Sequence, residues 1–137
     1  MTRSPAFLDS VGLLAVWNHS DQWHRPATEA YRKLQAEKAV LFSSSFVLLE
    51  CANAAVRRSY RESVVDLRRT LLAKGLLLSP TEAEVEAAWY AYERGHVGSP
   101  GVVDLVSFQL MRRAGISRVL TNDRHFRDEG FETLFEG

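Results

Sequence analysis

The segment Ala6-Phe7-Leu8-Asp9 is a short apolar run that ends in a carboxylate, and this pattern organises the rest of the chain. Three later acids also interrupt or follow apolar runs: Glu50 in Phe46-Val47-Leu48-Leu49-Glu50, Asp104 in Val102-Val103-Asp104-Leu105-Val106, and Asp123 after Val119-Leu120-Thr121-Asn122. A carboxylate withdrawn from water needs hydrogen bonds, a cation or a proton. Two carboxylates about 4 Å apart repel by roughly 4 kcal/mol at an effective dielectric constant near 20. A bound divalent cation would relieve all four acids.

Short runs rich in Val, Leu and Phe alternate with longer helix-like segments, which is the pattern of a parallel sheet covered by helices. A chain of 137 residues with 46% hydrophobic residues fits one domain with a core. We therefore predict an α/β fold, a single domain over residues 1–137 with a central, mostly parallel sheet flanked by helices. The predicted strands are Ala6 to Leu8, Ala39 to Phe42, Gly75 to Leu78, Arg118 to Thr121 and Phe131 to Leu134.

Helix boundaries are indicated by capping residues. Thr81 and Glu84 have capping-box spacing, and Gly115 can end the helix that carries Asp104. Ser44 or Ser45 can cap the helix that carries Glu50. Two further helices are expected, from Val11 to Trp17 and from Pro26 toward Lys38.

Composition excludes several classes of protein. The net charge is zero, which disfavours an indiscriminate nucleic-acid binder. The single cysteine, Cys51, predicts a buried reduced thiol, and no secretory signal or membrane-spanning run is apparent, so a cytoplasmic protein without a membrane partner is expected. Positive charge is nevertheless clustered, either as solvated helix faces or as phosphate contacts. The two basic groups are Arg57, Arg58, Arg61, Arg68, Arg69 and Lys74, and Arg112, Arg113, Arg118, Arg124 and Arg127.

Asp9 and Asp123 each follow a predicted strand, and ligands of open parallel sheets bind in the crevice beyond the carboxyl ends of the strands. Each of the four acids could instead have a purely structural role. Asp9 and Asp123 can cap the helices that follow them, and Asp104 in a first helical turn is favoured by the helix dipole. Glu50 is the hardest to account for in this way, because its neighbours are apolar and its structural role would be an ion pair with Arg57 or Arg58.

Taken together, these segments resemble the PIN-domain nucleases and, among them, the VapC-like toxins of type II toxin–antitoxin systems. The resemblance spans nearly the whole chain and depends on the order and spacing of its pieces. The pieces are Phe7-Leu8-Asp9-Ser10, the run from Ser45 to Ala54, the run from Val103 to Phe108 with Met111 to Ile116 after it, and Leu120 to Phe126 followed by Gly130-Phe131.

The resemblance implies a metal-dependent endoribonuclease toxin that acts on single-stranded RNA, is neutralised by a cognate antitoxin and forms a homodimer. The positions matching Asp9, Glu50, Asp104 and Asp123 would be catalytic and would hold Mg²⁺ or Mn²⁺. A metal-activated water would attack the phosphate in line, leaving 5′-phosphate and 3′-hydroxyl ends. Neighbouring side chains add weaker candidates. Ser10 and Thr121 would orient the metal or water, and Arg112, Arg124 and His125 would contact phosphates or RNA.

Two other functions are also compatible with the sequence. A small phosphohydrolase of the haloacid-dehalogenase kind could start from Asp9, but the second acid expected two residues later is Val11. A non-catalytic interaction module would use the acids as caps and ion pairs, with Trp17, Trp89, Tyr90 and Tyr92 as a partner surface.

Overall fold

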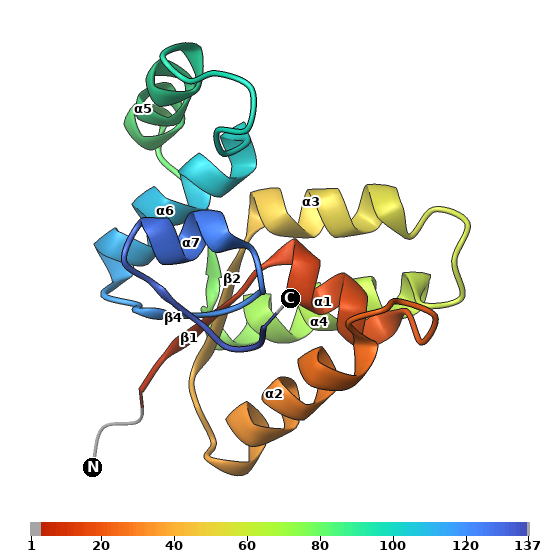
Figure 1. Ribbon diagram of the computed structural model, residues 1–137. Coiled ribbons are helices and arrows are strands. Elements are labelled where there is room, and N and C mark those ends of the chain that lie inside the picture. Colours follow the sequence, from red (N-terminus) through yellow and green to blue (C-terminus); the bar gives the residue numbers. More distant parts are fainter. Residues whose placement is uncertain (1–3, 137) are drawn as a thin grey trace.

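A computed structural model, which describes residues 4–136, contains a five-stranded sheet in which every pair of neighbouring strands is parallel (Figure 1). The strand order is β3-β2-β1-β4-β5. The α/β prediction is confirmed, with a sheet that is parallel throughout. The strands are β1 (Ala6–Leu8), β2 (Leu41–Ser44), β3 (Leu77–Leu78), β4 (Arg118–Leu120) and β5 (Glu132–Thr133).

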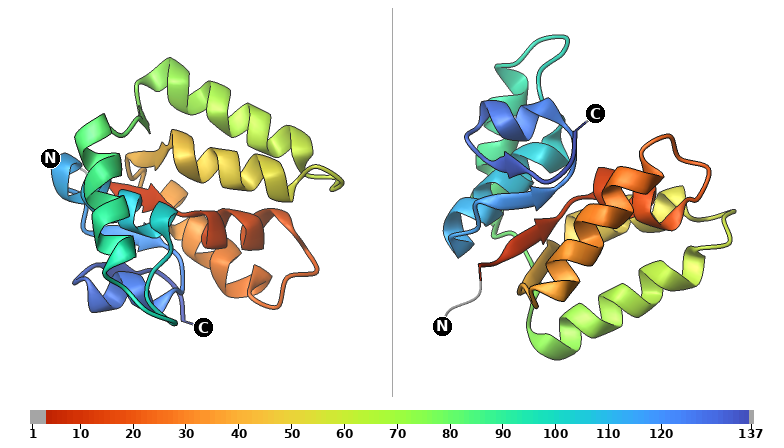
Figure 2. Two further views of the ribbon diagram at one scale, coloured as in Figure 1. Left: turned by 90° about the horizontal axis from the view of Figure 1, so that it is seen from above. Right: turned by 60° about the horizontal axis from the view of Figure 1, so that its bottom comes forward.

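Helices α1 to α4 lie on one side of the sheet and α6 and α7 on the other, where α5 packs on α6 (Figures 1 and 2). Right-handed crossovers give this division. The chain crosses the sheet in one direction from β1 through β2 to β3, and in the opposite direction from β3 through β4 to β5. None of the described helices is long and apolar enough to cross a bilayer. The helices are α1 (Ser10–Trp17), α2 (His24–Ala36), α3 (Ser45–Ala54), α4 (Arg61–Lys74), α5 (Glu82–Glu93), α6 (Val102–Ala114) and α7 (Arg124–Asp128).

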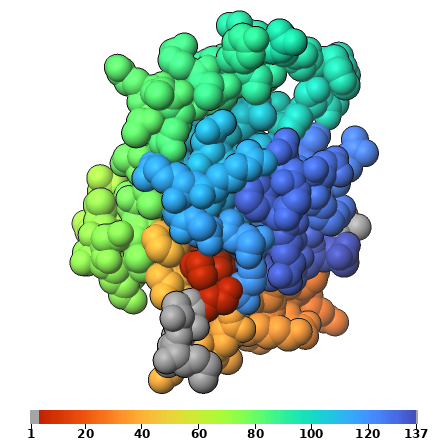
Figure 3. All heavy atoms as spheres, turned by 90° about the vertical axis from the view of Figure 1, so that its left-hand side faces the viewer, coloured from red at the N-terminus to blue at the C-terminus, as the bar shows by residue number. Residues whose placement is uncertain are grey.

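The first strand lies at the centre of the sheet. Phe7 pairs with Phe42 on one side and with Val119 on the other. In Figure 3 the first described residues (red) lie between orange and blue segments. Ala6, Phe7 and Leu8 are fully buried. The order reverses between β1 and β4, so the carboxyl ends of these two strands flank the topological switch point of the sheet.

Helix α1 approaches the sheet closely because it contains a glycine at the point of contact. A Cβ atom on Gly12 would lie 2.1 Å from the carbonyl oxygen of Leu120 on β4. The C-terminal end of α6 also depends on glycine, since Gly115 has a φ of 70° and ends that helix as the sequence predicts. Both positions keep the helices that carry or adjoin the predicted acids in register with the strands.

Two capping predictions are confirmed. Thr81 and Glu84 form the full capping box of α5, and Ser44 accepts a hydrogen bond from the amide of Val47 at the start of α3. The prediction for β2 is displaced by two residues. Lys38 adopts a φ of 56° and the amide of Ala39 still bonds to Leu34, so the end of α2 uses residues that the apolar pattern had assigned to the strand.

Candidate metal centre

The four predicted acids come from four different elements and gather at the switch point of the sheet. Asp9 directly follows β1 and Asp123 lies three residues after β4, while Glu50 lies on α3 and Asp104 on α6. We call these four residues the acid cluster. Their charges act on one another: Asp104 is affected by the other three, and Asp9 by Glu50. The fold therefore brings together acids that are up to 114 positions apart in the sequence.

Asp9 is the most constrained member of the cluster. Its side chain is fully buried, and neither carboxylate oxygen has a hydrogen-bond partner that meets normal geometry. It occupies the N-cap position of α1, but its side chain makes no capping bond, so capping does not account for this acid. Burial raises the pKa of Asp9 to about 7, and the charge of Glu50 adds to the rise; the nearby Thr121 hydroxyl and the amides of Val11 and Ser10 offset part of it.

Asp104 is half-buried in the first turn of α6. Desolvation, which is the largest cause, and the charges of Asp9, Asp123 and Glu50 together raise its pKa to about 8. The dipole of α6 favours an anion at this position, yet that effect does not outweigh three neighbouring carboxylates. Without a cation, Asp104 holds a proton at neutral pH.

Glu50 is exposed on the second turn of α3 and accepts a hydrogen bond of 2.9 Å from the hydroxyl of Ser10. The ion pair with Arg57 or Arg58 that would have given Glu50 a structural role is not formed. The ion pairs among residues 4–136 include none between the acid cluster and a lysine or arginine. The cluster thus holds excess negative charge that no lysine or arginine compensates.

Asp123 does cap α7, since its Oδ1 atom accepts a hydrogen bond from the amide of His125. The same oxygen lies 2.9 Å from Nδ1 of His125, whose Nε2 lies 2.7 Å from the carbonyl oxygen of Gly98. Each contact is a hydrogen bond when the ring nitrogen concerned carries a proton. Ligand atoms of Asp104, Asp123 and His125 lie within 4.8 Å of one another, which is compact enough for one metal ion.

Three hydroxyl or thiol groups adjoin the cluster. Thr121 is buried, lowers the pKa of Asp9 and accepts a hydrogen bond of 3.3 Å from the amide of Asp123. Sequence reasoning missed Ser107, whose buried hydroxyl has no partner among the described residues. Its spacing of three residues from Asp104 was the available signal. Cys51 is a buried free thiol as predicted, and burial with the charges of Asp9 and Glu50 raises its pKa to about 12.

The arginines proposed for RNA contact differ in their surroundings. Arg112 forms an ion pair with Glu129 and lies over the ring of Phe131, with 5.3 Å from its guanidinium carbon to the ring centroid. Its charge is therefore already compensated. Arg124 is exposed at the first residue of α7, next to Asp123, and has no ion pair among residues 4–136. Of the two, Arg124 is the one free to contact a phosphate.

The donor set fits a hard divalent cation. Carboxylate oxygens are the ligands that Mg²⁺ and Mn²⁺ prefer, and the two unpartnered oxygens of Asp9 lack the hydrogen bonds that buried polar atoms normally make. The compact group of ligand atoms consists of Asp104, Asp123 and His125 and does not include Asp9 or Glu50. A cation next to Asp9 would offset the desolvation and the charge repulsion that raise the pKa values of Asp9 and Asp104.

Comparison with known proteins gives the family to which the chain belongs. A search of curated proteins found no match. Among solved structures, the chain is similar to VapC20 of Mycobacterium tuberculosis, described as a Sarcin-Ricin loop cleaving toxin, with 27% identity, a TM-score of 0.74, and coverage of 92% of this chain and 95% of that one. Residues 7–132 match the family model of the PIN domain, a span that contains the whole acid cluster. The chain therefore belongs to the PIN domain family.

Proposed function

We propose that this protein is a metal-dependent endoribonuclease toxin whose activity a cognate antitoxin neutralises. The proposal depends mainly on Asp9, whose two buried carboxylate oxygens have no hydrogen-bond partner. Three further acids lie near it, and no lysine or arginine of residues 4–136 forms an ion pair with any of the four. An arrangement that costs stability in this way is typical of a functional site. Family membership and the similarity to an RNA-cleaving VapC toxin support the same activity.

In this proposal Asp9, Asp104 and Asp123 hold Mg²⁺ or Mn²⁺, with Glu50 beside them. When bound, the cation supplies Lewis acidity and neutralises charge at the scissile phosphate. Ser10 orients Glu50 through its hydroxyl hydrogen bond to Oε1. His125 fixes Asp123 by donating from Nδ1 and ties it to the loop between α5 and α6 through Gly98.

In this proposal the exposed Arg124 binds a phosphate of the RNA next to the acid cluster. Because the attacking group is water, the 2′-hydroxyl of the substrate is not consumed, and the products carry a 5′-phosphate. The test is to map 5′-phosphate ends in cellular RNA after induction of the wild-type protein and of Asp9→Asn. We expect new ends with the wild-type protein alone. Equal patterns in the two samples would overturn the proposal.

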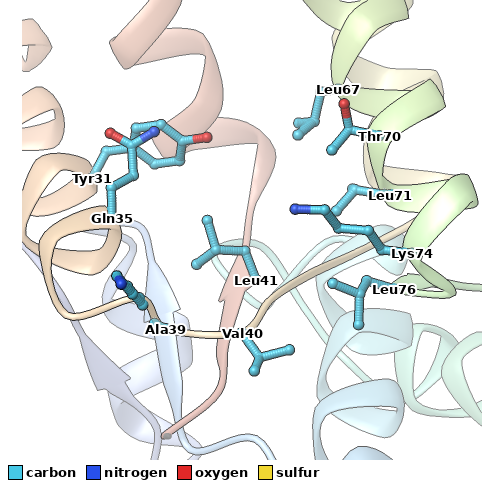
Figure 4. Close-up of a pocket in the computed structure, with 11 residues that line it drawn as sticks. Tyr31, Gln35, Ala39, Val40, Leu41, Leu67, Thr70, Leu71, Lys74 and Leu76 are labelled. Atoms are coloured by element: carbon cyan, nitrogen blue, oxygen red, sulfur yellow. The ribbon is translucent and has the colours of Figure 1, made fainter.

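A groove between α2 and α4 supports the antitoxin part of the proposal. It has a volume of about 550 Å³, and Leu41, Leu67 and Leu71 contribute to its apolar lining (Figure 4). Lys38 and Lys74 also line it, and both are exposed. An antitoxin segment with apolar side chains for the lining and acidic ones for the two lysines fits this surface. Growth arrest on expression of the chain alone, with rescue by the antitoxin, tests this part.

The interaction-module alternative has one observation in its favour. Trp89, Tyr90 and Tyr92 on α5 are the exposed aromatic residues among the large hydrophobic side chains of residues 4–136. We propose that they form the homodimer surface that the family resemblance implies, since an exposed aromatic face is a usual feature of an interface. Light scattering on wild-type protein and on Tyr90→Glu checks this. A pure interaction module would bind no Mn²⁺ and cleave no RNA.

A further inference from the structure

A second concave site lies at the far ends of α1 and α3. Residues 18–20, after α1, form one wall, residues 57–59, after α3, form the other, and Trp17 and Tyr60 complete the lining. The volume is about 390 Å³ and the lining is mostly polar. The two rings stack with centroids 6.2 Å apart, which fixes the two connecting segments against each other. We call this site the basic cup.

The basic cup carries positive charge that the protein does not compensate. Arg57 and Arg58 both line it and both are exposed, and neither takes part in an ion pair among residues 4–136. The lining contains no Asp or Glu. By contrast, Arg113 and Arg118 of the second basic group are both paired with glutamates.

The same two helices connect the basic cup to the acid cluster. Helix α1 begins at Ser10, whose hydroxyl bonds to Glu50, and ends at the cup; α3 carries Glu50 and ends just before Arg57. The helices pack against each other and run side by side (Figures 1 and 2). Eight residues of α1 at 1.5 Å each span roughly 12 Å, a distance that a few nucleotides can bridge.

The path between the two sites is free of further negative charge. Neither residues 11–17 of α1 nor residues 51–56 of α3 and its extension contain an Asp or Glu. The side chain of Asn53, one turn beyond Glu50, is exposed and polar. A nucleic acid strand lying along α1 and α3 would therefore meet no repulsive side chain between Glu50 and the arginines.

We infer that the basic cup binds a phosphodiester of the single-stranded RNA substrate a few nucleotides from the cleaved bond. The inference rests on the proposed nuclease function. Two adjacent guanidinium groups on a concave polar surface suit the oxygens of a phosphate, and the serine hydroxyls in both walls can donate further hydrogen bonds. The cup thus favours substrates long enough to reach it from the acid cluster.

The test compares Arg57→Ala/Arg58→Ala with a matched control, Arg68→Ala/Arg69→Ala. The control removes the same charge from two adjacent exposed arginines on α4. Binding of labelled single-stranded RNAs of about 2 nucleotides, too short to reach the cup from the acid cluster, and of about 12 nucleotides, within known single-strand site sizes, is measured by fluorescence anisotropy in the inactive Asp104→Asn background. Thermal unfolding shows whether both double variants remain folded.

We expect the cup variant to bind the longer RNA about tenfold more weakly at low salt. The slope of log K against log salt should be smaller by about 0.7 for each phosphate that the variant no longer neutralises. The shorter RNA should bind equally well to both variants, and the control should change by less than about twofold. Equal weakening in both double variants, or none in either, would overturn the inference. Normal RNA binding combined with an inability to bind polyglutamate would overturn it in favour of a protein-docking site.

Failure of the nuclease proposal can be told apart from failure of the cup. With Mn²⁺ and an intact acid cluster, cleavage of the shorter RNA should be unaffected in the cup variant, while cleavage of the longer one should show a raised KM and unchanged kcat. If wild-type protein and the cup variant cleave the longer RNA with the same KM, the inference about the basic cup is wrong and the nuclease proposal is unaffected. RNA bound through the arginines but never cleaved contradicts the nuclease proposal alone.

Discussion

Glu84 and Asp104 lie on the neighbouring helices α5 and α6, and both are half-buried, yet their surroundings are opposite. Arg113 donates two hydrogen bonds to Glu84, of 2.8 and 3.0 Å, and this pairing lowers the pKa of Glu84 to about 2. Asp104 forms no ion pair with a lysine or arginine of residues 4–136, and burial together with the charges of three other acids raises its pKa to about 8. Glu84, which stabilises the fold, is thus paired with an arginine. Asp104, which is proposed to hold a metal, has no such partner.

The largest difference between the paired region around Glu84 and the acid cluster around Asp104 is expected from the substitution Asp104→Asn. Cleavage of RNA should fall more than a hundredfold, above about 2.7 kcal/mol, because even residues that only orient metal ligands cost about 10- to 100-fold. The metal-free protein should become more stable, because folding no longer requires a buried carboxyl either to take up a proton or to face the charges of three other acids. Cleavage rates with Mn²⁺ and thermal unfolding without metal measure the two effects.

Glu84→Gln is the matched control for Asp104→Asn, because it makes the same chemical change in the paired region. It should lower stability and leave cleavage unchanged. Cleavage by Asp104→Asn at a rate within tenfold of the wild type would contradict the role given to this acid.

The pH dependence of stability should show the same contrast. The ordinary carboxyl pKa is 3.8, whereas those of Asp9 and Asp104 in the fold are about 7 and about 8. Between these values the folded protein binds more protons than the unfolded chain, so the stability of the metal-free protein falls as pH rises from about 4 to about 8. The decrease should be on the order of 2 kcal/mol, with solvent relaxation taken into account.

Urea unfolding in EDTA at about pH 5 and about pH 8 measures this decrease. Saturating Mn²⁺ should reduce it, because a bound cation favours the ionised acids, and Asp104→Asn should reduce it in the absence of metal. Glu84 has the opposite sign, since its contribution is lost as pH falls from 4.5 toward about 2. A metal-free protein that is more stable at pH 8 than at pH 5 would be incompatible with unpaired acids in the cluster.

Arg113→Ala should destabilise the fold by about 1 to 2 kcal/mol without affecting cleavage. The substitution removes a two-point ion pair and a third hydrogen bond to the carbonyl oxygen of Ser79, and charge-assisted bonds are stronger than neutral ones, though partial exposure of Arg113 limits the effect. Arg112→Ala is a useful comparison. Its single exposed pair with Glu129 should contribute less than about 0.5 kcal/mol by the same unfolding measurement.

The sequence allowed prediction of the parts of the fold in which local pattern and tertiary packing agree. The apolar run before Asp9 predicts a central strand, and the spacing of Thr81 and Glu84 predicts a capping box, because both depend on neighbouring residues. The start of β2 was predicted two residues too early, because here the local pattern and the packing disagree. Ala39 and Val40 are apolar, but the turn at Lys38 that ends α2 determines where pairing can begin.

Prediction of the candidate site had a similar limit. Acids in apolar surroundings could be found from the sequence, since each is costly without a partner. The groups that surround them could not. The carbonyl oxygen of Gly98 reaches His125 across 27 positions, and the hydroxyl of Ser10 reaches Glu50 across 40. Such contacts depend on how helices and loops pack around the sheet, which no local pattern specifies.

Thr81→Ala should destabilise the fold by about 1 kcal/mol, the usual contribution of an N-cap hydroxyl. The Thr81 hydroxyl accepts a bond from the amide of Glu84, and Oε1 of Glu84 accepts one from the amide of Thr81 while also bonding to Arg113. One carboxylate therefore serves both the cap and the ion pair. Thr81→Ser, which keeps the hydroxyl, is the control.

Because Glu84 is shared, the effects of Thr81→Ala and Arg113→Ala should not add. Without Arg113, Glu84 can still accept the Thr81 amide, but it is less firmly oriented; without the cap, Arg113 pairs with a glutamate on a frayed helix end. The coupling should appear as an interaction energy of about 0.5 kcal/mol or more in a double-mutant cycle of unfolding free energies. Strict additivity would mean that the cap and the ion pair stabilise α5 independently, and the paired region would then be two separate interactions placed side by side.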